Sequence, residues 1–151
     1  MTVLTVDACV LINGGRIMLT QRMPPRDFAF CWECPGGKRE DGESGPSAAT
    51  RELREELGLT IPSDFEPEPL FFELVEITDW RRVRLNFWLI TSAVGCLQSN
   101  DGQGVGWFAP EELTRIARTP GNRMATQRLI DIIRWRPNAT RLMLVSPGAG
   151  R

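Results

Sequence analysis

A chain of 151 residues with 42% hydrophobic and 25% charged residues is expected to form one soluble globular domain with its own core. Its formal net charge of −1 excludes a general electrostatic attraction to duplex nucleic acid or to a membrane, so any binding of phosphate must be local or depend on a metal ion. The sequence contains no histidine, which excludes histidine acid–base chemistry and zinc sites with histidine ligands.

The first residues of the chain do not have the pattern of an export signal. Residues 1–12 lack a basic region and run directly into a strand pattern, and no apolar run approaches the roughly 18 residues that a membrane helix needs. Of the four cysteines, Cys31 and Cys34 form one C-x-x-C pair in an expected strand, where side chains three apart point to opposite faces. We interpret the cysteines as free thiols, with a zinc or redox pair as the alternative, and expect a cytoplasmic protein.

Strands are predicted wherever apolar residues alternate or form short runs between turn signals. The first strand places its apolar side chains on one face and Thr5 and Asp7 on the other, as in a half-buried strand. Asn13-Gly14-Gly15 then predicts a hairpin turn. The predicted strands are residues 3–12, 16–22, 30–34, 70–78, 83–93 and 105–108.

Helices are predicted from apolar residues at helical spacing and from proline or cap residues at their starts, at residues 45–57, 110–118 and 122–135. We expect a domain over residues 1–136 and a weakly patterned tail over residues 137–151, disordered after Ser146. The order β-β-β-α-β-β-β-α-α fits an α/β fold in which helices cover a mixed β-sheet.

The helix predicted at residues 45–57 has a clear start and end. Ser44 is expected to cap its N-terminus, and Pro46 lies in the first turn, where its missing N–H costs nothing. Gly58 is expected to end the helix, with Leu59 folding back onto it.

Three carboxylates lie close together on the side of this helix that is expected to be exposed. At about 100° per residue, Glu52, Glu55 and Glu56 share one arc. Like charges at this spacing destabilise a helix by roughly 0.2–0.5 kcal/mol per pair. Such a cluster suits a hard divalent cation that takes oxygen ligands and is shared with substrate phosphates. The alternative is an acidic solvent face with Arg51 and Arg54 as partners.

The stretch around this helix matches a known pattern. Gly37 is followed by five residues and Glu43, then by seven residues and the run Arg51-Glu52-Leu53-Arg54-Glu55-Glu56-Leu57-Gly58-Leu59. This 23-residue stretch agrees with the Nudix box at all nine defined positions, so the chain resembles the Nudix hydrolase family. The resemblance implies a Nudix-type α/β/α sandwich with a mixed β-sheet and an enzyme that uses Mg²⁺ or Mn²⁺ to cleave phosphoric anhydride bonds.

Residues outside the box resemble the MutT-like branch of the family, which hydrolyses nucleoside triphosphates to monophosphate and pyrophosphate. Two positions depart from that branch: Cys34 stands where an aromatic residue usually lies beside the base pocket, and Asp101 stands where a longer glutamate is common. The similar segments are residues 20–22, 32–38, 86–89, 101–103, 106–107 and 120–122.

The resemblance also implies roles for individual residues. Arg51 is expected to orient the carboxylates by charge-assisted hydrogen bonds rather than by touching substrate, and Glu43 is expected to brace the loop. Asp101 is expected to bind a further metal ion or to act as base, with a turn aspartate at a loop tip as the alternative. Glu52 or Glu55 is expected to accept the proton of the attacking water, whose pKa the metal lowers. The implied metal ligands are Glu52, Glu55, Glu56 and the Gly37 carbonyl.

A second group of residues is expected to contact the nucleotide: Arg22, Gly36, Lys38 and Asn122. Arg22 is expected to bind phosphate, with an exposed arginine at a strand end as the alternative. Asn122 presents a donor and an acceptor together and is expected to read the base, with an ordinary helix N-cap as the alternative.

Each of the remaining aromatic and basic candidates outside the box has a structural interpretation as well as a functional one. The cluster Arg81-Arg82-Arg84 at a hairpin tip is interpreted as a solvated strand edge, with RNA or dinucleotide binding as the alternative. Four aromatic residues are interpreted as core residues, with stacking on a base as the alternative: Phe28, Phe30, Phe72 and Trp88.

The predicted substrate is a nucleoside triphosphate with either an oxidised purine, as in 8-oxo-dGTP, or a pyrimidine base. The alternatives are a hydrolase of ADP-ribose or another nucleoside diphosphate derivative, and a non-catalytic nucleotide sensor. We expect the nucleotide to be the partner, without membrane or duplex nucleic acid, and the protein to be a monomer or homodimer.

Overall fold

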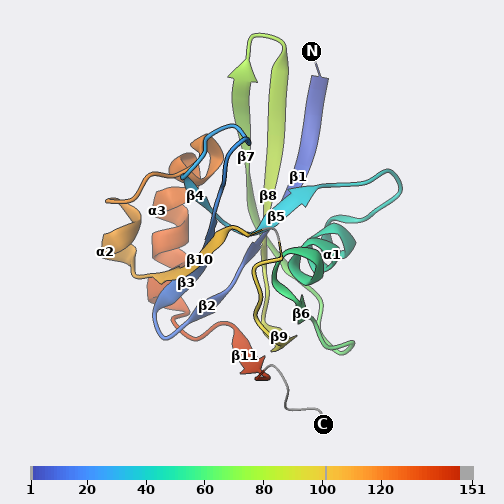
Figure 1. The fold of residues 1–151 in the computed structure, drawn as a ribbon, viewed down its shortest axis with the longest axis vertical. Coiled ribbons are helices and arrows are strands. Elements are labelled where there is room, and N and C mark those ends of the chain that lie inside the picture. Colours follow the sequence, from blue (N-terminus) through green and yellow to red (C-terminus); the bar gives the residue numbers. More distant parts are fainter. Residues whose placement is uncertain (1, 101, 147–151) are drawn as a thin grey trace.

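The computed structural model of the chain describes residues 2–100 and 102–146. At its centre lies a mixed sheet with the strand order β5-β1-β8-β7. In this sheet β1 runs parallel to β8, whereas β5 and β7 are antiparallel to their neighbours. The predicted mixed sheet is therefore confirmed, and the long β7–β8 hairpin extends past the helices (Figure 1). The strands are β1 (Thr2–Val10), β5 (Gly36–Lys38), β7 (Glu68–Thr78) and β8 (Arg81–Leu89).

Two smaller sheets complete the strand structure. The second sheet contains β2 (Ile12–Asn13), β3 (Arg16–Gln21), β4 (Trp32–Glu33) and β10 (Gly104–Phe108). The third contains β6 (Leu59–Thr60), β9 (Ser92–Gly95) and β11 (Arg141–Leu144). The predicted hairpin turn joins β2 to β3, with Gly14 and Gly15 at φ 59° and 71°, values that glycine adopts readily.

Helices cover the central sheet from both sides, as Figure 1 shows. α1 (Gly45–Leu57) lies on one side, and α2 (Pro110–Leu113) and α3 (Pro120–Trp135) lie on the other. Each side has its own buried cluster, with Leu53 of α1 in one and Leu129 of α3 in the other. The predicted α/β/α sandwich is confirmed.

The burial of β1 differs from the prediction. Ala8 and Val10 belong to the cluster shared with α3, but Cys9 and Leu11 are equally buried in the cluster shared with α1. Asp7, on the face expected to be solvated, is fully buried. The half-buried interpretation was wrong because α1 and the Trp88 side chain cover the face that the polar residues suggested was open.

Several boundaries in the second half of the chain also differ. The helix predicted at residues 110–118 ends at Leu113, and α3 begins at Pro120 rather than Asn122. The strand predicted at residues 83–93 ends at Leu89, and β9 pairs in a different sheet.

The tail predicted from residue 137 contributes to the fold before it leaves the described residues. Within it, β11 pairs in parallel with β9, and the Thr140 N–H donates to the Ile12 carbonyl at 2.8 Å. Residues 147–151, for which disorder was expected, lie outside the described part of the chain. No helix in the described ranges is long and apolar enough to cross a membrane.

Candidate active site

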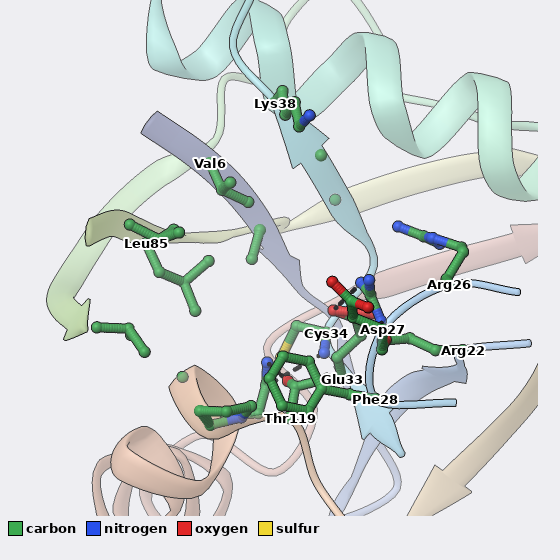
Figure 2. Close-up of a pocket in the computed structure, with 18 of the residues that line it drawn as sticks. Val6, Arg22, Arg26, Asp27, Phe28, Glu33, Cys34, Lys38, Leu85 and Thr119 are labelled. Atoms are coloured by element: carbon green, nitrogen blue, oxygen red, sulfur yellow. Dashed lines mark hydrogen bonds and ion pairs between the residues drawn. The ribbon is translucent and has the colours of Figure 1, made fainter. Parts of the chain in front are cut away.

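A cavity of about 700 Å³ opens between the central sheet, the loop that follows β3 and the first turn of α3. Figure 2 shows Arg22, Phe28 and Glu33 gathered on one side of it, with Val6 and Leu85 on another. A volume of this size lies in the range of small-molecule sites, about 300–1,000 Å³. Its polar and aromatic lining includes Arg22, Phe28, Glu33, Lys38, Glu52, Glu56, Gln103 and Asn122.

Helix α1 begins and ends as predicted. The Ser44 hydroxyl accepts a hydrogen bond from the Ser47 N–H at 3.2 Å, and Pro46 occupies the first turn. Gly58 ends the helix at φ 68°, and its N–H donates to the Arg54 carbonyl at 3.0 Å. These caps satisfy terminal backbone groups and thereby fix which residues the helix presents to the cavity.

The three carboxylates of α1 are not equally exposed. Because Leu53 and Leu57 are fully buried, they set the rotation of the helix about its axis. Glu52 and Glu56 consequently line the cavity, with the Glu52 side chain 14% exposed and Glu56 8% exposed. The Glu55 side chain is 54% exposed and is not among the lining residues. The expectation of an exposed cluster was wrong for the first two, because neighbouring segments cover that side of the helix.

Glu52, Glu56 and Gly37 meet at the same cavity. A Cβ added at Gly37 would lie 2.4 Å from Oε1 of Glu52, so any larger residue would displace that carboxylate. Nε2 of Gln103 donates to Oε2 of Glu56 at 3.4 Å. Carboxylate and carbonyl oxygens form a donor set that fits a hard divalent cation. Among residues 2–100 and 102–146, no three acidic or cysteine side chains form a metal cage, so a bound cation would also need water or substrate phosphate as ligands.

Arg51 connects the acidic residues of the box. Its Nε and Nη2 each donate to the Glu43 carboxylate at 2.8 Å, and its Nη1 donates to Glu52 at 2.9 Å and Glu55 at 3.2 Å. Hydrogen bonding from Arg51 lowers the pKa of Glu43 to about 2, and the same contact raises the pKa of the guanidinium. Arg51 is not among the lining residues, and its Nη2 also donates to the Lys38 carbonyl at 3.0 Å. Asp101 lies outside the described residues.

Arg22 lines the cavity and is held by two contacts. Its Nε donates to the Asp27 carbonyl at 2.7 Å, and its Nη1 donates to Oε2 of Glu33 at 3.0 Å. The Arg22 side chain is only 19% exposed, so the alternative of an exposed arginine at a strand end was wrong.

Glu33 is a candidate residue that the sequence analysis missed. Burial raises the pKa of its carboxyl, although Arg22 acts in the opposite direction. A titratable group with a shifted pKa in a cleft is a candidate for function. Its only sequence signal was a position just before the glycine turn, which does not reveal that the side chain faces the cavity.

Asn122 lies at the centre of a small buried network. Its Oδ1 accepts a hydrogen bond from the Cys34 N–H at 2.9 Å, and its Nδ2 donates to the Thr119 hydroxyl at 3.1 Å. Thr119 is the N-cap of α3, so the N-cap alternative for Asn122 was wrong. The residue is 5% exposed and lines the cavity.

Gly36 and Lys38 flank Gly37 on β5 and also line the cavity. A Cβ at Gly36 would lie 2.2 Å from the Asp7 carbonyl oxygen, so glycine permits β5 to approach β1 closely. Lys38 is exposed and pairs with Val6 across the strands.

The aromatic candidates separate into different environments. Phe28, Phe30 and Phe72 are 44%, 56% and 45% exposed, so a core position was the wrong interpretation for all three, and of these Phe28 lines the cavity. Trp88 packs partly into the cluster with α1, and its Nε1 donates to Asp7 at 2.9 Å.

The arginines of the β7–β8 hairpin have separate surroundings. Nη2 of Arg82 pairs with Glu76 at 2.8 Å, and the guanidinium of Arg84 lies 4.0 Å from the ring centre of Phe72. Arg81 lines the cavity.

All four cysteines are free thiols, as predicted. Burial raises the pKa of the Cys9 and Cys34 thiols, which keeps both protonated and unreactive. Cys34 follows β4, which is shorter than the strand predicted at residues 30–34.

Comparison with known proteins identifies the family. Residues 1–129 match the NUDIX domain family model. The chain is 34% identical over 122 residues to a CTP pyrophosphohydrolase of Escherichia coli (81% of this chain, 87% of that protein). It is 31% identical over 130 residues to an 8-oxo-dGTP diphosphatase of Haemophilus influenzae (85% and 93%).

Solved structures agree with this match. The solution structure of the E. coli ORF135 protein superposes with a TM-score of 0.76 at 31% identity, covering 91% of this chain and 95% of that one. A MutT structure described for Aliivibrio salmonicida and Vibrio cholerae gives a TM-score of 0.70 at 27% identity, covering 86% and 98%. The chain belongs to the Nudix family and is a hydrolase of phosphoric anhydride bonds.

Proposed function

We propose that this Nudix hydrolase cleaves a nucleoside triphosphate to the monophosphate and pyrophosphate, with Mg²⁺ or Mn²⁺ as cofactor. The observation that carries the proposal is that Glu52 and Glu56 line the same cavity as Arg22 and Asn122. Acidic ligands for a cation, a guanidinium for phosphate and an amide for a base are thus available to one bound molecule.

The proposed cation ligands are Glu52, Glu56 and the Gly37 carbonyl, with Glu55 as a further ligand. When bound, the cation neutralises charge on the phosphate oxygens and lowers the pKa of a coordinated water. The Glu52 carboxylate occupies the space that a Cβ at Gly37 would need, and this close approach supports a shared role for the two residues. Asp101 is proposed as a further ligand or base.

The remaining box residues hold these groups in place. Arg51 joins Glu43, Glu52 and Glu55 through one guanidinium, which limits the movement of the acidic side chains without entering the cavity. Since phosphoryl transfer depends mainly on positioning and on stabilising charge, loss of this orientation would slow turnover.

Binding of the nucleotide is assigned to the other residues of the cavity. Arg22 and Lys38 supply positive charge for the triphosphate, and the Gly36 backbone adds close contact. Asn122 is proposed to read an edge of the base with the Nδ2 hydrogen that Thr119 does not use. Phe28 is proposed to stack on the base, because its ring is exposed at the cavity.

The base is proposed to be either an oxidised purine or a pyrimidine. The relatives named above support both, since one is named for CTP and the other for 8-oxo-dGTP. The four free cysteines favour a reducing cytoplasm as its place of action. A net charge of −1 favours a free nucleotide over duplex nucleic acid as substrate. The protein is proposed to act as a monomer or homodimer.

The test is a panel of about twenty nucleotides with Mg²⁺, in which phosphate and pyrophosphate are measured separately. CTP, dCTP, 8-oxo-dGTP, dGTP and ADP-ribose are the essential members, and a Glu56→Gln preparation controls for contaminating phosphatases. Pyrophosphate from one triphosphate well above the others supports the proposal and names the base. Products from ADP-ribose alone, or no turnover of any nucleotide, would refute it.

A further inference from the structure

An ion pair between a fully buried carboxylate and a half-buried guanidinium lies beside the proposed cation site but outside the cavity. Asp7 on β1 is fully buried, and the Arg39 side chain meets it from the segment after β5. Nε of Arg39 donates to Oδ2 of Asp7 at 2.9 Å, and Nη2 donates to Oδ1 at 2.8 Å. Such a two-point contact fixes the orientation of the guanidinium as well as its distance from the carboxylate.

Two further donors surround the same carboxylate. Nε1 of Trp88 lies 2.9 Å from Oδ1 of Asp7, and Nδ2 of Asn86 lies 3.3 Å from it. Both donors come from β8, the parallel neighbour of β1. Asp7 therefore connects β1, β8 and the segment after β5 through one buried group.

The Asp7–Arg39 pair lies at the end of β5, the strand that contains Gly37. In the register of β1 and β5, Asp7 lies opposite Gly37, and Arg39 follows two residues later. The Arg39 N–H also donates to the Thr5 carbonyl at 3.0 Å. β5 is a three-residue strand at the edge of its sheet, so it has few backbone contacts of its own. A shift of one residue would turn its side chains to the opposite face.

The same network reaches the start of α1. A Cβ added at Gly45, the first residue of α1, would lie 2.2 Å from Cζ2 of Trp88 and 2.8 Å from Nη2 of Arg39. The helix therefore begins directly against two of the groups that Asp7 holds. The start of the segment between β5 and α1 therefore binds Asp7 through Arg39, and its end packs against Arg39 and Trp88, both of which donate to Asp7.

Stability alone is a weak reason for this arrangement. Removing the Asp7 charge from water offsets much of its attraction to Arg39, and well-packed apolar residues often replace a buried ion pair without loss of stability. What an apolar pair does not supply is the fixed direction of a guanidinium–carboxylate contact.

We propose that Asp7 and Arg39 are positioning residues that hold the Gly37 backbone against Glu52 and so set the geometry of the proposed cation site. The inference rests on the proposed function, because it assigns Gly37 and Glu52 to that site. The ion pair acts through the backbone of β5 and the start of α1, and neither Asp7 nor Arg39 contacts the substrate.

The test compares Arg39→Met with the double variant Asp7→Asn/Arg39→Met. The single variant leaves a charge buried and is expected to lower the melting temperature, whereas the double variant removes both charges and keeps an acceptor for Trp88. Arg39→Lys keeps the charge but loses the two-point contact. Arg82→Met is the matched control, because it removes an exposed pair with Glu76 on the same sheet.

Two measurements report on positioning without turnover. Amide hydrogen exchange over residues 36–44 is measured without metal, and Mn²⁺ binding is measured by electron paramagnetic resonance with the metal alone. In the double variant we expect faster exchange confined to this segment and a fall in Mn²⁺ affinity of about 10–100-fold, the usual effect of removing a group that orients metal ligands. With nucleotide, kcat should fall more than KM rises, and Arg39→Lys should recover part of the loss.

Unchanged exchange and unchanged Mn²⁺ affinity in a folded double variant would overturn the inference and leave the pair as a packing feature. A wild-type protein that binds no Mn²⁺ would refute the proposed cation site instead. Exchange over residues 36–44 would then still decide whether the pair holds β5.

Discussion

Oδ1 of Asn122 accepts a hydrogen bond from the Cys34 N–H at 2.9 Å, across 88 residues of chain. The bond joins the first turn of α3 to the segment between β4 and β5, and Gly36 and Gly37 follow directly on β5. The Asn122 side chain therefore connects the proposed base-binding part of the cavity to the proposed cation-binding part. Its substitutions have to separate an effect on base recognition from an effect on the position of the segment before β5.

Asn122→Asp is expected to change base preference, and because the position is 5% exposed the new carboxylate is also expected to lower stability. Aspartate keeps the acceptor for the Cys34 N–H but removes both side-chain N–H donors. Relative kcat/KM among bases should shift about tenfold, because a polar contact of this kind contributes about 1–3 kcal/mol. Asn122→Ala also leaves the Cys34 N–H without its acceptor and should lower the unfolding free energy by about 1–3 kcal/mol. An equal fall for all nucleotides in Asn122→Asp would contradict a role in reading the base.

Glu56→Gln is expected to reduce turnover by about 10²-fold or more, the effect of losing one group that stabilises charge in the transition state. The side chain is 8% exposed, so a neutral residue of the same shape should preserve the fold. Steady-state kinetics and a thermal melt check both points. Glu55→Gln should cost less, because the Glu55 carboxylate is 54% exposed and does not line the cavity. Turnover like that of wild type in Glu56→Gln would remove Glu56 from the cation site.

Gly37→Ala is expected to lower kcat by about 10²-fold, because a misplacement of about 1 Å can have this effect. The new Cβ would lie 2.4 Å from Oε1 of Glu52 and would displace that flexible side chain rather than the backbone. Gly42→Ala, in the loop that follows β5, is the control: its Cβ meets no atom within 4 Å but strains a backbone at φ 81°. It should reduce stability by about 1 kcal/mol and leave kcat close to that of wild type. Equal kcat values for the two variants would argue against the Gly37 assignment.

Phe28→Ala is expected to raise KM about fivefold or more, since stacking of a base on an aromatic side chain contributes about 1–3 kcal/mol. Phe30→Ala is a matched control, because both residues are exposed and have positive φ, 58° and 69°, but only Phe28 of the two lines the cavity. Initial rates over a range of nucleotide concentrations distinguish them. A rise in KM in both variants would indicate an effect of the loop rather than of one ring.

Glu43→Gln is expected to lower stability in a pH-dependent manner. Hydrogen bonding from Arg51 lowers the pKa of Glu43 from 4.5 to about 2, so the ionised form is favoured in the folded protein. The contribution of Glu43 is therefore present above about pH 4.5 and is lost as pH falls toward 2. Urea unfolding at several pH values should show a lower midpoint for the variant at pH 7 and a difference that narrows in acid. A constant difference down to pH 3 would show that the carboxylate charge is not responsible.

Part of the structure followed from local sequence. The cap residues Ser44 and Gly58 defined α1 correctly because capping depends on the hydrogen bonds and φ values of adjacent residues. The turn at Gly14 and Gly15 was recognised for the same reason. Other features had no local signal, because β11 pairs with β9 from a segment about fifty residues away and its own pattern is weak.

By itself, the sequence determined the box helix, the mixed sheet, the family and the residues that bear the carboxylates, because these depend on spacing along the chain. Only the tertiary structure decided which of those carboxylates reach the cavity: burial of Leu53 and Leu57 turns Glu56 inward and leaves Glu55 outside. It also buried Asp7 against the half-buried guanidinium of Arg39 and placed Glu33 in the cavity wall. Whether a charge is buried or paired depends on segments that are distant in the chain. The local sequence around an acidic residue therefore does not determine whether that residue is solvated, paired with a cation or part of the site.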